Sequence, residues 1–253
     1  MAALLFATGT IGGALNAVAG GGSFIVFPTM LFAGVPPVAA NATTAAALWP
    51  AGLASAVAYR RELPKERKTL VVLAAASALG GTLGAKLLLL TSDETFAKLV
   101  PFLLLAASAV FTFGPRLTKR SSEPRPAGEG AAPVSLAAGA FVQLLIASYG
   151  GYFGGGMGIL MLATLTLMGM ANIHEMNALK IVLGILINGA ANIAFLLAHK
   201  VQFDVAIPVV LGAITGGWLG AATARRFDPK KVRLVVMIFA WSLTAFFFVK
   251  LAR

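Results

Sequence analysis

The sequence predicts an all-α polytopic membrane protein made of two inverted repeats, each a glycine-broken helical hairpin followed by three transmembrane helices. Three observations lead to this prediction. The chain is apolar along nearly its whole length, a pattern of glycines and polar residues recurs at an offset of 136 residues, and the basic residues gather in three short segments.

The composition is that of a membrane protein. Of the 253 residues, 58% are hydrophobic and only 11% are charged, whereas a soluble domain usually carries about 25% charged residues. Several apolar stretches run for about 18 residues or more without a charge, which is typical of membrane spans. The chain contains no cysteine, which excludes disulfides, thiolate metal sites and cysteine nucleophiles.

Glycine and proline residues divide the apolar stretches into helices. The three glycines at residues 20–22 would each cost a helix interior about 1 kcal/mol, so we expect the first helix to break there. A second glycine cluster at residues 154–158 predicts the same break in the second half. The expected helices cover residues 2–19, 24–33, 36–59, 69–90 and 96–113, then 134–150, 159–170, 176–198, 205–223 and 232–249.

A single offset of 136 residues aligns the two halves without a gap. Three separated places match at this offset, and their joint match indicates a duplicated unit. Residues 1–113 form the first predicted repeat, residues 114–133 a cytoplasmic linker rich in Pro, Arg, Ser, Gly and Glu, and residues 134–253 the second repeat. The matching places are Gly20 and Gly22 with Gly156 and Gly158, Asn41-Ala42 with Asn177-Ala178, and Gly80-Gly81-x-x-Gly84 with Gly216-Gly217-x-x-Gly220.

The basic residues predict the orientation of the chain. Residues 60–68, 116–125 and 225–233 hold 14 of the 20 Lys and Arg residues, as expected for cytoplasmic loops under the positive-inside rule. The three segments share one side only if each glycine-broken unit is a hairpin that enters and leaves on the same side. Each half then crosses the membrane an odd number of times, so the halves are inverted. Broken helices in inverted repeats are a recurring feature of secondary transporters.

The hairpin tips are the predicted substrate site. Helix N-termini present free N–H groups and a positive dipole end, which suit an anion, and Ser23 is placed to cap the second arm of the first hairpin. Lys180 lies one turn from Asn177 inside a span, where an ionisable group is a functional hypothesis by default. Two alternatives stay open: the glycines allow close helix packing, and Lys180 snorkels to the interface.

Asn188, two turns beyond Lys180, is either a substrate ligand or a hydrogen-bonding group between helices. The second intramembrane lysine, Lys86, is interpreted as a snorkelling residue. The predicted substrate-binding residues are Gly20, Gly21, Gly22, Ser23, Asn41, Thr43, Gly155, Gly156, Asn177, Lys180 and Asn188.

Other classes of chemistry have no candidate residues. All nine Asp and Glu residues fall in expected loops or at loop edges, so no proton relay of buried carboxylates is evident. His174 and Glu175 do not form the two-histidine zinc motif. We therefore expect no enzyme activity, no metal, no cofactor and no nucleic-acid partner.

The motifs resemble those of the TauE/SafE family of sulfite exporters, and the resemblance covers essentially the whole chain. It rests on Ala19-Gly20-Gly21-Gly22-Ser23 followed by Pro28, on Ala40-Asn41-Ala42-Thr43-Thr44, on Gly154-Gly155-Gly156-Met157-Gly158, and on His174-Glu175-Met176-Asn177-Ala178-Leu179-Lys180. The resemblance implies a permease for sulfite, sulfonates or related organic anions in a bacterial inner membrane. Lys180 departs from the threonine-containing motif that other family members carry there, so identical substrate contacts do not follow.

Together these points predict a secondary transporter of a small anion, sulfite or an organosulfonate, which works by alternating access around a site between the two repeats. The alternatives are a non-transporting membrane scaffold or assembly factor, and a passive anion channel. The sequence leaves open the particular anion, the direction, the coupling ion, a possible homo-oligomer and whether the two glycine tips meet.

Overall fold

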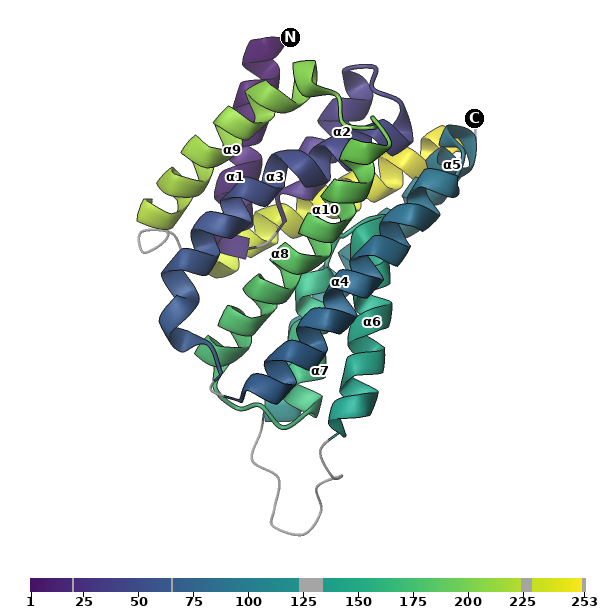
Figure 1. The fold of residues 1–253 in the computed structure, drawn as a ribbon. Helices are drawn as coiled ribbons and strands as arrows, with labels where there is room; N and C mark the ends of the chain where they lie inside the picture. Colours follow the sequence, from purple (N-terminus) through teal and green to yellow (C-terminus); the bar gives the residue numbers. More distant parts are fainter. Residues whose placement is uncertain (20, 65, 123–133, 224–228, 252–253) are drawn as a thin grey trace.

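The part of the chain that the structure describes consists of helices joined by turns and short loops (Figure 1). The computed structural model describes residues 1–19, 21–64, 66–122, 134–223 and 229–251. No strand occurs in these ranges, which confirms the all-α class. The helices are α1 (Ala2–Ala19), α2 (Ser23–Phe32), α3 (Pro37–Tyr59), the 3₁₀ turn η1 (Arg60–Glu62), α4 (Arg67–Leu90), α5 (Asp93–Ser122), α6 (Leu136–Tyr152), α7 (Met157–Leu167), α8 (Ile173–Leu197), α9 (Phe203–Thr223) and α10 (Pro229–Leu251).

Each helix overlaps one of the segments expected from the sequence. The largest difference is at α5, which continues to Ser122, past the start of the expected linker at residue 114. The remainder of that linker, residues 123–133, lies outside the described ranges.

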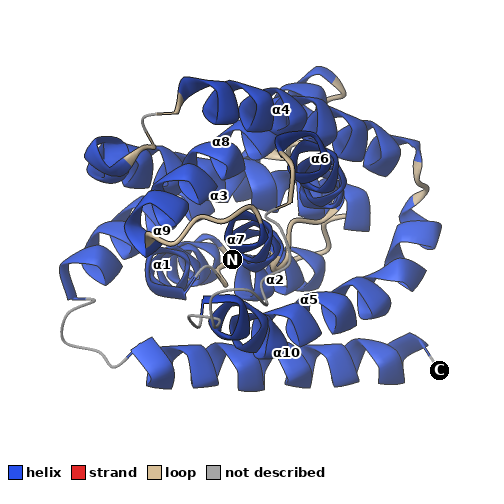
Figure 2. Cartoon of the chain, turned by 90° about the horizontal axis from the view of Figure 1, so that it is seen from below, coloured by secondary structure: helices blue, strands red, loops and turns tan. Residues whose placement is uncertain are grey.

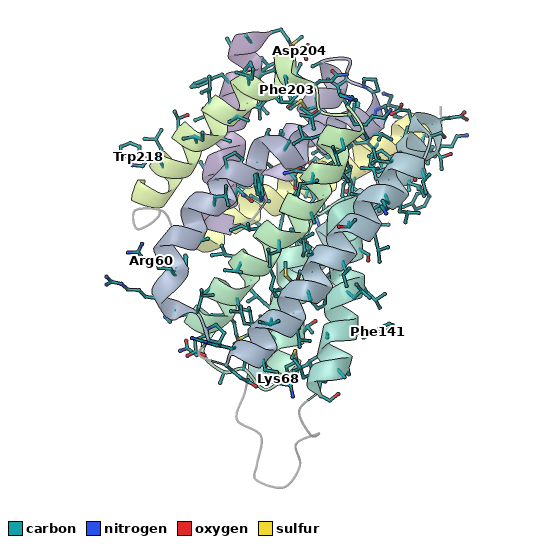
Figure 3. All side chains as sticks on the ribbon, viewed as in Figure 1. Arg60, Lys68, Phe141, Phe203, Asp204 and Trp218 are labelled. Carbon is teal, nitrogen blue, oxygen red and sulfur yellow. The ribbon has the colours of Figure 1, made fainter. Side chains whose placement is uncertain are left out.

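Five helices of the described chain are long and apolar enough to cross a membrane: α4, α5, α8, α9 and α10. Large apolar side chains also cover the outside of the molecule. Phe141 on α6 is 62% exposed and Trp218 on α9 is 71% exposed, and both project outward (Figure 3). Water would disfavour such a surface but lipid tails solvate it. The chain is therefore a multi-pass membrane protein.

The chain reverses direction at both glycine clusters. Gly12 of α1 packs against Val26 of α2, so α2 returns along α1 after the turn that includes Gly21 and Gly22. Likewise, Gly139 near the start of α6 packs against Met168 just after α7. Each glycine cluster thus forms the tip of a helical hairpin. We call residues 21–22 the first tip and residues 153–156 the second tip.

Helices α3 and α8 occupy the middle of the bundle (Figure 2). On one side α3 contacts α9, which is paired with α1; on the other, α8 contacts α4, which is paired with α6. Helices α5 and α10 pack together along another edge. This order places both hairpins against the central pair.

The α1–α9 and α4–α6 pairs are held together by backbone-to-backbone approach at glycines. A Cβ atom on Gly216 of α9 would fall on the carbonyl group of Thr10 in α1, and one on Gly84 of α4 would fall on that of Ser148 in α6. Small residues at membrane helix contacts allow this approach and strengthen dispersion contacts between the helices.

The two halves have the same order of helices. A shift of 136 residues brings α1–α5 onto α6–α10, and it converts the α1–α9 pair into the α6–α4 pair. Two hydrogen bonds join residues separated by this same interval. The indole N–H of Trp49 donates to the carbonyl of Ile185 at 3.1 Å, and the hydroxyls of Ser108 and Thr244 lie 3.2 Å apart.

Helices α5 and α10 are antiparallel. The rings of Phe102 and Phe248 pack edge to face with centroids 5.2 Å apart, whereas further along α5 the hydroxyl of Thr112 accepts from the indole of Trp241 at 3.0 Å. Residue numbers rise along one helix as they fall along the other, which defines the antiparallel arrangement.

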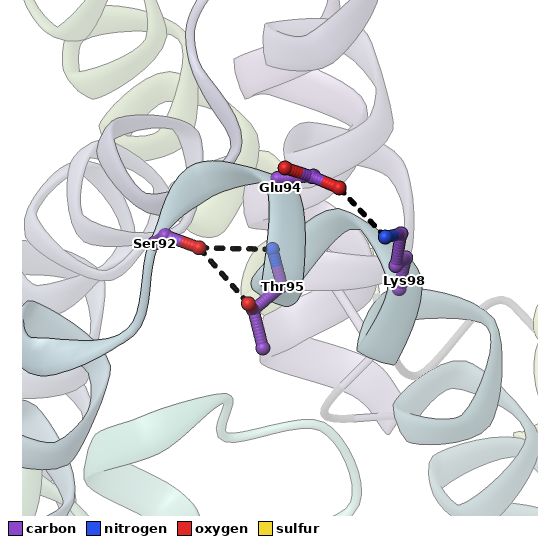
Figure 4. Close-up of polar contacts among 4 residues, drawn as sticks. All are labelled: Ser92, Glu94, Thr95 and Lys98. Carbon is purple, nitrogen blue, oxygen red and sulfur yellow. Dashed lines mark hydrogen bonds and ion pairs between the residues drawn. The ribbon is translucent and has the colours of Figure 1, made fainter.

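The turn between α4 and α5 is stabilised locally (Figure 4). The hydroxyl of Ser92 accepts from the backbone amide of Thr95 at 3.2 Å, which satisfies one donor at the start of α5. Glu94 and Lys98 form an ion pair one turn apart at 2.6 Å. Both side chains are mostly exposed, so this pair contributes little to stability.

We expect Gly216→Ala to lower the free energy of unfolding by about 1–3 kcal/mol, because the new methyl group overpacks the α1–α9 contact. The matched control is its neighbour Gly217→Ala, where the nearest atom lies 3.8 Å from the new Cβ. This control should be neutral, or stabilising by up to about 1 kcal/mol, because alanine is the better helix former. Thermal unfolding in detergent measures both variants, and equal melting temperatures would contradict the packing assignment.

Candidate functional site

The second tip is a backbone conformation that only glycine adopts easily. Helix α6 ends at Tyr152, and Gly154 and Gly156 follow with φ angles of +84° and +76°. A side chain at either position would strain the left-handed backbone. Helix α7 then begins at Met157 with Gly156 as its N-cap. The tip therefore points the first turn of α7 back towards the end of α6.

Tyr149 holds this tip in place. Its hydroxyl donates to the carbonyl of Gly155 at 2.6 Å. The amides of Gly156 and Gly158 donate to no backbone carbonyl of the described residues. Such first-turn amides are the normal free donors of a helix start.

Lys180 of α8 lies against the first turn of α7. Its Cδ atom is 3.4 Å from the position of a Cβ on Gly158, so the aliphatic part of the side chain packs over the helix start. Its ammonium group donates to the Oδ1 atom of Asn177, one turn earlier on α8, at 2.9 Å. The predicted pair of Asn177 and Lys180 is thus brought to the second tip.

The ammonium group of Lys180 has no acidic partner in the described part of the chain. The ion pair found in that part joins Glu94 and Lys98 instead. The positive end of the α7 dipole adds to the same field. Two positive groups side by side repel each other and together favour an anion between them. The local field at the second tip would thus favour a negatively charged group over a positive one.

Asn41 connects the first half of the chain to the second tip. Its Nδ2 atom donates to the carbonyl of Tyr152 at 3.0 Å, and its side chain is 6% exposed. Thr43 lies elsewhere: its hydroxyl accepts from the amide of Gln202 at 3.1 Å, in the turn between α8 and α9. The structure thus brings Asn41 to the second tip, whereas Thr43 lies near the C-terminal end of α8, away from Lys180.

The first tip differs from the second in its local structure. Gly21 packs against Val236 of α10, and Gly22 packs against the backbone of Gly12. Gly22 is the N-cap of α2 and Ser23 is its first helical residue, with no side-chain cap. The expected cap by Ser23 is therefore wrong, because α2 starts at Ser23 itself, one residue earlier than a serine N-cap requires. Gly20 lies outside the described residues.

The two hairpins touch through aromatic rings. Phe27 of α2 packs edge to face on Phe153 of the second tip, with centroids 5.8 Å apart. Phe24 packs on Phe111 of α5 at 6.1 Å, one turn from Ala107, which contacts Gly155. These rings were not among the predicted site residues. An aromatic residue within one or two turns of each glycine cluster is the signal that could have identified them.

Asn188 bonds within its own helix, donating to the carbonyl of Gly184 at 2.9 Å. Lys86 is exposed near the end of α4, as a snorkelling lysine would be.

Two cavities of about 450 and 640 Å³ lie away from the two hairpin tips. The first is bordered by the α2–α3 turn and the start of α5, the second by η1 and the α7–α8 turn. In the described ranges no three His, Asp or Glu side chains form a group that could hold a metal ion.

Comparison with known proteins supplies the family. The family model described as "Sulfite exporter TauE/SafE" matches residues 5–247. The chain belongs to the TauE/SafE family. This confirms the resemblance seen in the glycine clusters and in the Asn-containing motifs at the starts of α3 and α8.

Three relatives align over almost the whole chain. A "Probable membrane transporter protein" of Haemophilus influenzae is 29% identical over 96% of this chain and 92% of its own length. "Probable membrane transporter protein ORF9" of Sinorhizobium sp is 29% identical over 95% and 90% of the two chains. "Probable membrane transporter protein YfcA" of Escherichia coli K12 is 24% identical over 96% and 87%. No solved structure is significantly similar to this TauE/SafE chain.

We expect Tyr149→Phe to loosen the second tip, because the Gly155 carbonyl loses its donor inside the bundle. Loss of one buried hydrogen bond should speed amide hydrogen exchange of residues 153–158 about five- to tenfold. Hydrogen–deuterium exchange with mass spectrometry measures this. Tyr59→Phe, on a partly exposed tyrosine at the end of α3, is the control and should leave the tip unchanged. An unchanged tip in Tyr149→Phe would remove the anchoring role.

Proposed function

We propose that this TauE/SafE chain is a secondary transporter of a small anion, sulfite or an organosulfonate, which it binds at the second tip. Family membership and the three relatives support membrane transport as the class of activity. The main support for an anionic substrate is Lys180, a partly buried basic residue beside a helix start and without an acidic partner in the described chain. The family description supports a sulfur oxyanion.

Each predicted residue of the second half has a role in this proposal. The ammonium of Lys180 pairs with the anion, and Asn177 positions that ammonium through its Oδ1 atom. The amides of Gly155 and Gly156 at the tip, together with the first turn of α7, donate to the anion oxygens. Asn188 lines the same face of α8, two turns beyond Lys180.

The first half contributes the opposing surface. Asn41 fixes the carbonyl of Tyr152, and the hairpin of Gly20, Gly21, Gly22 and Ser23 approaches the second tip through Phe27 and Phe153. Thr43 supports the far end of α8 through Gln202 rather than the anion itself. The substrate would thus lie between the halves, nearer to the second tip than to the first.

Alternating access would come from one half rocking against the other, and an inverted repeat is its structural basis. If a symmetry axis relates the two halves, a residue can contact the equivalent residue 136 positions away only close to that axis. Trp49 contacts Ile185 in this way, and Ser108 contacts Thr244. Counterpart helices α5 and α10 are antiparallel, which a twofold axis produces only when it runs across the helices. With helices that cross the membrane, this axis lies in the membrane plane.

The proposed location is a bacterial inner membrane with the basic segments in the cytoplasm. Arg60 and Lys68 lie towards one end of the molecule and Asp204 at the other (Figure 3). Placing the basic end in the cytoplasm follows the positive-inside rule.

We expect Lys180→Met to weaken binding of sulfite and methanesulfonate about 10- to 100-fold, because charge-assisted hydrogen bonds to the anion are lost. Lys86→Met, a lysine on the exposed surface of α4, is the matched control and should bind as the wild type does. Titration calorimetry of the purified protein and uptake into proteoliposomes provide the measurements. Unchanged affinity in Lys180→Met would remove Lys180 from the site, and binding without uptake would favour a scaffold.

Single cysteines can be placed without background, because the chain has none. We expect Arg120→Cys and Lys230→Cys to react with impermeant maleimide from the cytoplasmic side of the membrane, and Asp204→Cys to react from the opposite side. Labelling of positions 120 and 230 from opposite sides would contradict the inverted repeat. Equivalent positions, such as 94 and 230, would then be separated by an even number of membrane crossings, and the two halves would have the same orientation.

A further inference from the structure

Asn192 of α8 is a buried amide without a hydrogen-bond partner among the described residues. Its side chain is 3% exposed, and neither its Nδ2 nor its Oδ1 atom has a partner in the described chain. Other buried amides of these ranges are paired, as Gln143 is with Ser77 at 2.8 Å and Asn41 with Tyr152. Both functions of the Asn192 amide are therefore unused.

An unpaired amide in this place carries a free-energy penalty. Burying a carboxamide without hydrogen bonds costs about 1–3 kcal/mol in proteins, and lipid offers no water to relieve it. The fold itself does not require an amide there, because the counterpart position in α3 is Ala56. A leucine of similar volume would pack better, so the penalty points to a role in binding.

The position of Asn192 extends the polar face of α8. Asn177, Lys180, Asn188 and Asn192 are spaced by three, eight and four residues, which keeps them on one side of a helix. Asn192 lies about 18 Å beyond Lys180 along the axis, at 1.5 Å per residue. One turn from it, Gly189 packs against the ring of Trp49, so this part of α8 is covered by α3 of the other half.

We propose that Asn192 is a second, separate substrate contact about 18 Å beyond Lys180 along α8, and that it selects anions which also carry a hydrogen-bond donor. This inference rests on the proposed function. The Nδ2 group donates to an anion oxygen, and the Oδ1 atom accepts from an O–H or N–H of the same molecule. A ligand with only acceptor oxygens would pair with the Nδ2 group and leave the Oδ1 atom of Asn192 without a donor. The preferred class is therefore a small oxyanion with a hydroxyl, an amino group or a protonated oxygen.

The test compares two probes that differ in one hydroxyl group, 2-hydroxyethanesulfonate and ethanesulfonate. Wild-type protein in detergent should bind the hydroxylated probe about tenfold more tightly, the effect expected of one added hydrogen bond. Asn192→Leu should abolish this preference and leave the affinity for ethanesulfonate within about twofold. Calorimetry gives the affinities and thermal unfolding gives the stability of each variant.

Stability separates binding from simple misfolding. Asn192→Leu should unfold at the same temperature as the wild type or higher, because the unpaired amide is removed. Gln143→Leu is the control: it should unfold at a lower temperature, since Ser77 loses its partner, but keep the preference for the hydroxylated probe. If Asn192→Leu keeps the full preference, or if the wild type shows none, Asn192 is not a selecting contact.

The outcomes for Lys180 and Asn192 are independent. A probe of this size cannot reach across the about 18 Å between the two residues, so each variant reports on its own contact. If Lys180→Met weakens ethanesulfonate binding while Asn192→Leu removes only the preference for 2-hydroxyethanesulfonate, both proposals stand. If Lys180→Met changes neither probe, the anion site at the second tip fails, whereas a lost preference in Asn192→Leu would still place the substrate at Asn192.

Discussion

A helix that breaks inside a bilayer leaves backbone groups that lipid cannot pair, and the structure depends on how these groups are covered. At the second tip the cover is built from distant parts of the chain. Tyr149 pairs the carbonyl of Gly155, and Asn41, from the other half, pairs that of Tyr152. The amides of Gly156 and Gly158 at the start of α7 have no such backbone partner among the described residues, and the proposed anion site rests on these donors.

The two halves have the same order of helices but carry different polar residues at matched positions. At matched positions the second half carries Asn177 and Lys180, whereas the first carries Asn41 and Thr44. Thr44 bonds to its own helix at the carbonyl of Ala40. Two copies of a fold can thus diverge, one keeping the charge and the other supplying structural support.

Local patterns were enough to predict most of the fold. Runs of apolar residues between glycines and prolines predict the helices, because helix formation depends on neighbouring residues. The match of Asn41 with Asn177 aligns the halves, because a repeat can be read from the sequence without knowing any contact. The polar contacts were less accessible. That Asn41 would bond to Tyr152 depends on a contact between residues 111 positions apart, and the ring of Phe27 reaching Phe153 depends on the angle between two hairpins. The start of α2 at Ser23 shifted by one residue because glycine itself serves as the N-cap there.

The bond between Asn41 and Tyr152 ties the position of one half to the backbone of the other. Any rocking that separates these residues leaves a buried carbonyl and a buried amide without partners. That separation is opposed by about 1–3 kcal/mol until water or another donor takes over. The bond therefore acts as a latch: it favours the present arrangement of the halves, and any proposed rocking motion that separates Asn41 from Tyr152 must first release it.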